Sequence, residues 1–285
     1  MAVTPQMVKE LRDKTGAGMA VCKKALDEAQ GNMDEAIDNL RKRGAASVAK
    51  RADRSANEGA VVALTSADGT LGIMAEVNCE TDFVARNEEF VAFAAQIGET
   101  LLTQNVTTVE ELMAQSAGDK TLNDLYNEIL AKFSEKIGVK RFERRITSTG
   151  TVASYIHAGS KLGVLIETTA PVRSESGLAL LRDIAMQVAA MKPLYTDRSN
   201  VNTEAIEKEI EIYKEQAVNE GKKPEIAEKI ATGRLEKYYQ ENCLVEQAFV
   251  KDGNKTIKDV LKDISATEGN EVNLVSFTRY FLGEE

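Results

Sequence analysis

The sequence contains an internal repeat at an offset of 91 residues, and this repeat restricts the possible folds more than any other feature. Without a gap between the matches, residues 59–61 and 71–76 align with residues 150–152 and 162–167. The alignment continues into a helical stripe, in which Phe90, Phe93, Ala94 and Ile97 stand opposite Leu181, Ile184, Ala185 and Val188. Turn-forming residues separate the two strands of each unit, at 66–69 and 157–160. We therefore predict two duplicated units of strand, turn, strand and helix, which gives an α+β fold.

Three short helices are predicted before the repeat. Thr4 and Pro5 are typical of a helix start, since Thr caps a helix and Pro fits its first position. A second helix carries the apolar stripe Cys22, Ala25, Leu26 and Ala29, a third spans Asp34–Arg43, and glycines separate the three. Residues 45–58 are small and basic, which indicates a linker or a solvent-facing helix. We expect a compact N-terminal three-helix module.

The second unit is interrupted before its last strand. Final strands are predicted at Lys140–Ile146 and Asn273–Leu282. Between them, one apolar seam from Ile206 to Ala217 and a helix start at Pro224 are typical of an antiparallel helical hairpin that projects from the body. The predicted division is a helical module with its linker at 1–55, a first core subdomain at 56–147, a second at 148–198 and 240–285, and the hairpin insertion at 199–239.

Charge is distributed unevenly along the chain. Residues 1–55 hold 11 Lys and Arg against 8 Asp and Glu, whereas residues 56–285 hold 25 against 37. Most of the chain would repel phosphate, so direct binding of nucleic acid is disfavoured. No apolar run is long enough to span a bilayer and the N-terminus lacks a signal-peptide pattern, so we expect a cytoplasmic protein without membrane contact.

Residue patterns that carry catalysis or metal binding are scarce. The three cysteines, Cys22, Cys79 and Cys243, are far apart, which disfavours a disulfide framework and a zinc site. His157 is the single histidine. The sequence has no phosphate-binding glycine loop, metalloprotease motif, nucleophile elbow or calcium loop. We expect no metal, no cofactor and no enzymatic activity.

Two apolar residues have alternative interpretations. Met19, which follows Gly18, either fills the core of the helical module or lies exposed. Phe83 stands seven residues before Phe90, so a continuous helix would bury it. In the alternative, Asn87 caps the long helix and Asp82-Phe83 lie on a corner between strand and helix.

Four segments resemble the motifs of one known family, the translation elongation factor Ts proteins of bacteria and organelles. These segments are residues 11–19 with 22–26 (LRDKTGAGM and CKKAL), 76–85 (EVNCETDFVA), 157–165 (HAGSKLGVL) and 184–193 (IAMQVAAMKP). The resemblance covers nearly the whole chain. It implies a ubiquitin-associated-like helical module, a core of two subdomains and a coiled-coil insertion.

The resemblance also implies a function and a partner. Members of the family are guanine-nucleotide exchange factors for elongation factor Tu, the GTPase that carries aminoacyl-tRNA, and they release Mg²⁺ and GDP from it. An exchange factor acts by binding and needs no catalytic group. A rival interpretation of the sequence is a ribosome-associated or RNA-associated adaptor that uses the basic N-terminal module. The helical hairpin also allows self-association.

The resemblance carries over to particular residues as contacts with elongation factor Tu. Those residues are Arg12, Met19, Lys23 and Arg51 in the N-terminal region, Thr81, Asp82, Phe83 and Val84 at an intruding corner, Ile137 and Gly138 in a loop, and His157 in the second unit. Ala20 and Val21 depart from the family pattern, which commonly has a second methionine and an acidic residue there. The sequence ends at Glu285 without a further helical module that some members use against the partner, so we expect that contact to be missing.

Overall fold

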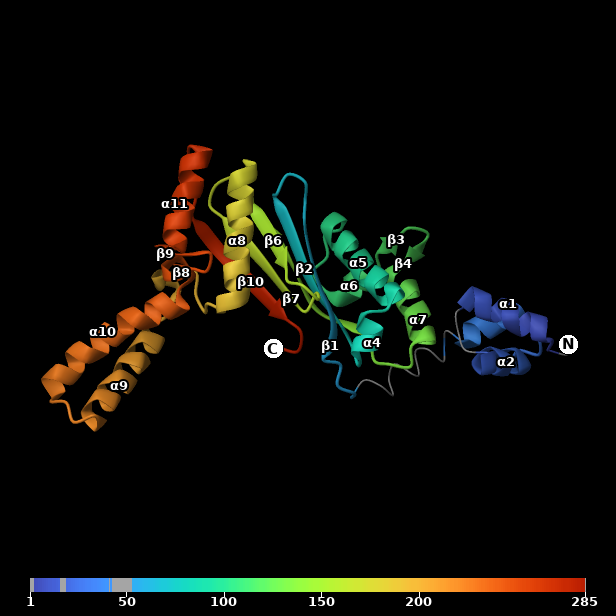
Figure 1. Cartoon of the computed structure of the whole chain (residues 1–285). Coiled ribbons are helices and arrows are strands. Elements are labelled where there is room, and N and C mark those ends of the chain that lie inside the picture. Colours follow the sequence, from blue (N-terminus) through green and yellow to red (C-terminus); the bar gives the residue numbers. More distant parts are fainter. Residues whose placement is uncertain (1–2, 16–18, 41, 43–52, 285) are drawn as a thin grey trace.

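The computed structural model describes residues 3–15, 19–40, 42 and 53–284 (Figure 1). At its N-terminal end lie α1 (Pro5–Thr15) and α2 (Met19–Glu28), and residues 33–40 are also helical. The backbone N–H of Met7 donates to the Thr4 hydroxyl over 3.2 Å, which confirms the predicted start of α1. These N-terminal helices share a core that contains Val8, Leu11, Cys22, Ala25, Leu26, Ala29 and Ala36. The predicted ends of the first and third helices, at 16–18 and 43–44, lie outside the described residues.

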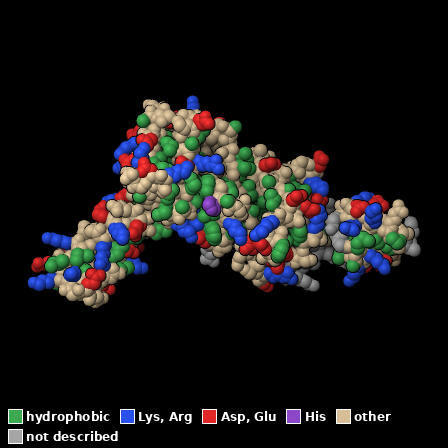
Figure 2. Space-filling view, viewed as in Figure 1, with side chains coloured by type: hydrophobic (Ala, Val, Ile, Leu, Met, Phe, Trp, Pro, Cys, Tyr) green, Lys and Arg blue, Asp and Glu red, His purple; other side chains and the backbone are tan. Residues whose placement is uncertain are grey.

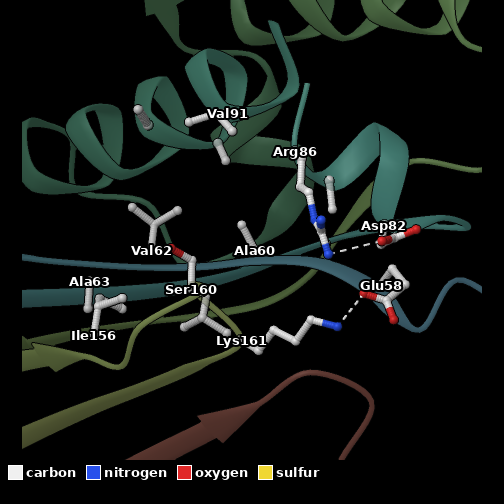
Figure 3. Close-up of a pocket in the computed structure, with 16 residues that line it drawn as sticks. Glu58, Ala60, Val62, Ala63, Asp82, Arg86, Val91, Ile156, Ser160 and Lys161 are labelled. Atoms are coloured by element: carbon white, nitrogen blue, oxygen red, sulfur yellow. Dashed lines mark hydrogen bonds and ion pairs between the residues drawn. The ribbon is translucent and has the colours of Figure 1, made fainter. Parts of the chain in front are cut away.

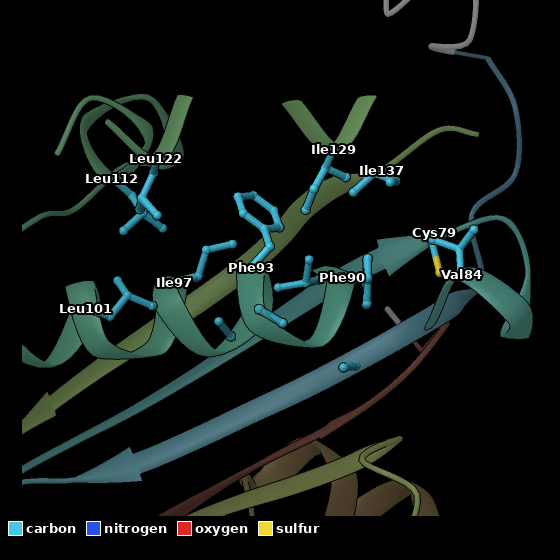
Figure 4. Close-up of a cluster of buried hydrophobic side chains, with 14 of the residues drawn as sticks. Cys79, Val84, Phe90, Phe93, Ile97, Leu101, Leu112, Leu122, Ile129 and Ile137 are labelled. Atoms are coloured by element: carbon cyan, nitrogen blue, oxygen red, sulfur yellow. The ribbon is translucent and has the colours of Figure 1, made fainter. Parts of the chain in front are cut away.

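The first sheet follows, with three antiparallel strands in the order β1-β2-β5. Their bounds are Glu58–Thr65, Leu71–Cys79 and Gly138–Ile146, which matches the predicted hairpin and final strand. The longest helix packed on this sheet is α5 (Glu88–Thr103), and the chain between α5 and β5 forms α6 (Val109–Met113), the short strands β3 (Ser116–Ala117) and β4 (Lys120–Thr121), and α7 (Leu122–Lys132). Between sheet and helices lies a core that includes Phe90, Phe93, Ile97 and Leu101 (Figure 4).

The second sheet also has three antiparallel strands, in the order β10-β7-β6. Their bounds are Leu274–Phe281, Leu162–Thr168 and Val152–Ile156. The helices α8 (Glu175–Met191) and α11 (Ile257–Glu268) pack with it, and β8 (Ala248–Phe249) and β9 (Asp252–Thr256) form a small ribbon before α11. In each sheet the second strand of the hairpin is central and the last strand of the unit is at an edge.

The helical hairpin consists of α9 (Thr203–Asn219) and α10 (Pro224–Asn242), flanked by the short helices η1 (Arg198–Asn200) and η2 (Leu244–Glu246). Figure 1 shows it extending away from the two sheets. Small side chains, including Ala217, Ala227 and Ala231, are buried along its seam. Arg198 holds its base, since its guanidinium bonds to the Glu236 and Glu246 carboxylates.

The two sheets contact each other through reciprocal pairs of residues. The N–H of Val61 donates to the carbonyl of Ser160 over 2.6 Å, and the N–H of Val152 donates to the carbonyl of Gly69 over 2.7 Å. Both donors and both acceptors are 91 residues apart. Such reciprocity is the signature of a two-fold contact between equivalent units. It supports the predicted duplication.

Glycines occupy the points of closest approach between the sheets, and they too are related by the repeat. A Cβ at Gly72 would lie 2.3 Å from Val152 Cγ1, and a Cβ at Gly163 would lie 2.6 Å from Val61 Cγ1.

The predicted α+β class is confirmed, while the boundaries of the four predicted parts stay predictions. Among the described residues, no helix has both the length and the apolar character that crossing a bilayer requires.

Candidate functional site: the corner after β2

Phe83 lies on a separate one-turn helix, α4 (Asp82–Ala85), between β2 and α5. Thr81 caps α4 at its N-terminus, and its hydroxyl accepts from the Val84 N–H over 3.4 Å. Asn87 then caps α5 with extended backbone, and its side chain accepts from the Glu89 N–H. A continuous helix that buries Phe83 is therefore the wrong prediction, and the alternative with Asn87 as the cap of the long helix is confirmed.

The side chains of α4 divide between core and solvent. Phe83 is 84% exposed, the largest exposed fraction among the described large hydrophobic side chains, whereas Val84 is 6% exposed and packs in the core beneath it. Asp82 pairs with Arg86 one turn later, with 3.1 Å between Oδ2 and Nη2. A large aromatic side chain that is exposed on an ordered corner leaves apolar area that a partner could bury.

The loop between α7 and β5 holds this corner in place. The Glu135 carboxylate accepts the backbone N–H of Glu80 over 3.1 Å, the N–H of Thr81 over 3.0 Å and the hydroxyl of Thr81 over 2.6 Å. In return, the Glu80 carboxylate accepts the Lys136 N–H over 2.6 Å. Sequence reasoning missed this pair of carboxylates, because they are 55 residues apart and neither belongs to a periodic pattern.

The structure brings the predicted residues Ile137 and Gly138 next to this corner. Gly138 pairs with Asn78 in the sheet, directly before the corner. The Ile137 side chain is 2% exposed and its carbonyl accepts the Tyr126 hydroxyl over 2.7 Å. The Ile137 side chain therefore belongs to the core, whereas Gly138 is partly exposed.

His157 lies exposed in the turn between β6 and β7. Its Nδ1 is 2.9 Å from the hydroxyl of Tyr155. The same turn holds Ser160 at a left-handed φ of 55°, and the Ser160 carbonyl bonds to β1. In Figure 2, hydrophobic side chains gather around this histidine on the face in view.

A groove of about 660 Å³ connects the corner with this turn (Figure 3). The outer edge of β1, the start of α5 and the turn after β6 form its walls, and its lining is mainly small and apolar, with Ala60, Val62, Val91 and Ile156 among the residues. Two ion pairs mark its rim: Asp82 with Arg86, and Glu58 with Lys161 at 2.6 Å. Asp82 and the turn that carries His157 thus border the same concave surface.

Three further predicted contacts, Arg12, Met19 and Lys23, lie on the helical module, away from the corner (Figure 1). Arg12 is exposed on α1, and Lys23 is exposed on α2. Met19 begins α2 and is 47% exposed, so its interpretation as a core-filling residue is wrong. Arg51 lies outside the described residues.

The Cys79 thiol lies buried in the core beside the corner. Burial raises the pKa of the Cys79 thiol to about 12, with a smaller contribution from the Glu135 and Glu58 carboxylates, so the thiol stays protonated. Its Sγ lies 3.2 Å from the carbonyl of Thr81. Within the described ranges, no three His, Cys, Asp or Glu side chains converge as metal ligands would.

Comparison with known proteins identifies the family. A sequence profile described as Elongation factor TS matches residues 80–284. The chain belongs to the elongation factor Ts family. It is 46% identical over 283 residues to "Elongation factor Ts" of Clostridium perfringens strain SM101, covering 99% of this chain and 93% of that protein. It is 47% identical over 285 residues to "Elongation factor Ts" of Prosthecochloris aestuarii, with 99% of both chains covered.

Membership in the elongation factor Ts family assigns the protein to translation elongation and to protein biosynthesis. The family profile begins at Glu80, so the matched region includes the corner, the turn that lines the groove, the last strand of each unit (β5 and β10) and the helical hairpin. The full-length relatives extend the similarity over the helical module as well.

Proposed function

We propose that the protein is a guanine-nucleotide exchange factor that binds elongation factor Tu and promotes the release of GDP. The observation that carries this proposal is the exposed Phe83 on a hydrogen-bonded corner, in a chain of the elongation factor Ts family. We expect it to act in the cytoplasm, where translation takes place, by binding alone.

Exchange requires that the factor binds the empty GTPase more tightly than the nucleotide-bound one, because by linkage each ligand weakens the other equally. Lowering the affinity of the GTPase for GDP about 10⁴-fold takes about 5.5 kcal/mol of differential binding free energy. Burying one phenylalanine contributes about 1.5–3 kcal/mol. Further contacts with the same partner must therefore supply the rest of this binding free energy.

The exposed predicted residues supply these contacts in our proposal. Phe83 enters the apolar interior beneath the nucleotide site, and Asp82 disturbs the groups that hold Mg²⁺ and the β-phosphate. The turn at His157 grips a second domain of the GTPase. The further contacts that we propose are Arg12, Met19, Lys23, Arg51, Thr81, Val84, Ile137 and Gly138, of which Val84 and Ile137 act from the core by supporting the surface above them.

The test is the rate at which elongation factor Tu releases a fluorescent GDP analogue. Wild type should accelerate release, and Phe83→Ala and Asp82→Ala should reduce the stimulation about tenfold or more. The matched control is Val275→Ala, which shortens another exposed apolar side chain, 46% exposed on β10. Equal stimulation by wild type and Phe83→Ala contradicts the proposed role of the corner.

His157→Ala separates the second contact from the first. We expect weaker binding of nucleotide-free elongation factor Tu by calorimetry, with an unchanged circular dichroism spectrum, because His157 is exposed and supports no core. Wild-type affinity in this variant means that the turn is solvated in the complex.

A further inference from the structure

We propose that Glu135 is a positioning residue, which holds the corner of Glu80 and Thr81 rigid so that Phe83 is presented to the partner in its binding conformation. This inference rests on the proposed exchange function and adds to it a residue that does not itself touch the GTPase. The geometry behind it is the set of three hydrogen bonds that the Glu135 carboxylate accepts from Glu80 and Thr81.

The helix that carries Phe83 cannot hold its own shape. It has four residues, and an isolated helix of that length does not form in water because nucleation costs more than one or two hydrogen bonds return. Its conformation depends on what fixes its N-cap residue. Glu135 fixes both the N–H and the hydroxyl of Thr81, the residue that caps this helix.

These hydrogen bonds are of the strong kind. A carboxylate that accepts backbone N–H groups and a hydroxyl makes charge-assisted bonds, which are about twice as strong as neutral ones. Glu135 is half-buried, and the Glu80 side chain closes the arrangement from the opposite direction by accepting the N–H of Lys136. Arg54 also donates to the Glu80 carboxylate, over 3.2 Å. Hydrogen bonds thus join the corner and the loop in both directions.

The second unit of the chain contains the same device. There the Glu268 carboxylate, at the end of α11, accepts the N–H of Arg173, the N–H of Ser174 and the hydroxyl of Ser174. Ser174 caps α8, as Thr81 caps α4. We call this arrangement, in which a glutamate accepts two backbone N–H groups and the hydroxyl of a helix cap, the glutamate clamp. It occurs in both units, with Glu135 and with Glu268, but only in the first unit is the capped helix a single turn with an exposed phenylalanine.

This difference shows what the first clamp does beyond stabilising the fold. A 17-residue helix packed on its sheet, such as α8, keeps its place by burial of its apolar face. The single turn α4 has one buried side chain, Val84, so its orientation depends on the clamp. Rigid presentation lowers the ordering cost of binding, and loss of the clamp returns that cost to the complex.

The experiment combines hydrogen exchange of the free protein with GDP release from elongation factor Tu. In Glu135→Ala, amide exchange of residues 80–85 should accelerate about tenfold, and stimulated GDP release should fall about tenfold. Glu135→Gln keeps the volume and one acceptor oxygen, so it should fall between wild type and Glu135→Ala. If Glu135→Ala disturbs the core, Glu135→Gln provides the same test in a folded variant.

Two comparisons distinguish positioning from general support of the fold. Glu268→Ala removes the equivalent three bonds in the second unit; it should accelerate exchange at 173–174 and leave the corner unchanged. The triple variant Glu135→Ala/Asp82→Ala/Phe83→Ala should stimulate no less than Asp82→Ala/Phe83→Ala, because Glu135 acts through these two side chains of the corner. Additive losses overturn the positioning role.

The outcomes also separate this inference from the proposed function. Unchanged exchange at 80–85 in Glu135→Ala overturns the clamp, as does full stimulation of GDP release by that variant when Phe83→Ala is impaired. If wild type itself leaves GDP release unchanged, the proposed function fails, and the positioning role fails with it.

Discussion

Gly72→Ala probes the contact between the two sheets, one of which leads into the Phe83 corner and the other of which carries the His157 turn. A Cβ at this position would lie 2.3 Å from Val152 Cγ1 and 3.3 Å from Leu165 Cδ2. Val152 is 1% exposed and Leu165 is fully buried, so neither side chain has open space to enter. Val152 is also β-branched and therefore restricted in its rotamers.

The cost of this substitution follows from the packing. An added methyl group in a filled core costs about 1–3 kcal/mol. Val152→Ala alone loses two buried methyl groups, about 1.6 kcal/mol, with a further cost for the cavity. In the double variant Gly72→Ala/Val152→Ala, the methyl group added at position 72 occupies the space that the valine leaves. The free energy of unfolding of the double variant should therefore be close to that of Val152→Ala, with a coupling of about 1–3 kcal/mol.

Urea denaturation followed by circular dichroism measures these free energies. Gly253→Ala is the matched control, because a Cβ at that exposed glycine has no neighbour within 4 Å, and we expect a change within about 0.5 kcal/mol. Gly163→Ala should repeat the pattern with Val61→Ala, given the 2.6 Å separation there. A stable Gly72→Ala, or strictly additive losses in the cycle, refutes the reciprocal contact.

Three further predictions concern other parts of the chain. Phe90→Ala should lower the free energy of unfolding by about 3–5 kcal/mol while Phe83→Ala changes it by less than about 0.5 kcal/mol, in the same urea assay, because Phe90 is fully buried and Phe83 is 84% exposed. Burial raises the folded-state pKa of Cys79 to about 12 from 9.0, so wild type should lose stability relative to Cys79→Ala only as the pH rises from about 9 to about 12, as measured by thermal unfolding across that window; an equal pH dependence in both proteins contradicts the assignment. Arg198→Ala should accelerate amide exchange within α9 and α10 several-fold and leave the two sheets unchanged, since its guanidinium joins the hairpin base to Glu236 and Glu246 and lies 4.5 Å from the Tyr239 ring; uniform acceleration across the chain argues against a local anchor.

The repeat and the hydrophobic periodicity predict most of the fold. The repeat locates β1, β2 and β7, and the helical apolar stripe locates α5 and α8, because burial of one face of a helix leaves a regular signal in the sequence. The final strands and the helical hairpin are located in the same way. Contacts between sheets leave no such signal, and only the structure shows that Gly72 and Gly163 are the points of closest approach.

The site is less predictable than the fold, because its decisive interactions are local breaks and distant hydrogen bonds. The spacing of Phe83 and Phe90 fits a buried helical face, yet the cap at Asn87 ends that pattern. Glu135 is an ordinary acidic residue by composition, and its three hydrogen bonds exist only because β5 returns beside β2. Exposure of Phe83 follows from these two features together.

The second unit shows what the corner would be without the break. At the offset of 91 residues, Asn87 corresponds to Leu178, which lies inside the uninterrupted helix α8. The helix α8 runs without interruption through the positions equivalent to residues 84–100, and Ser174, the equivalent of Phe83, is its N-cap. Both units share the glutamate clamp and the reciprocal sheet contact. The cap at Asn87, where the repeat has an apolar residue, therefore separates the single turn α4 from the long helix α5, and together with the hydrogen bonds of Glu135 it leaves Phe83 in solvent.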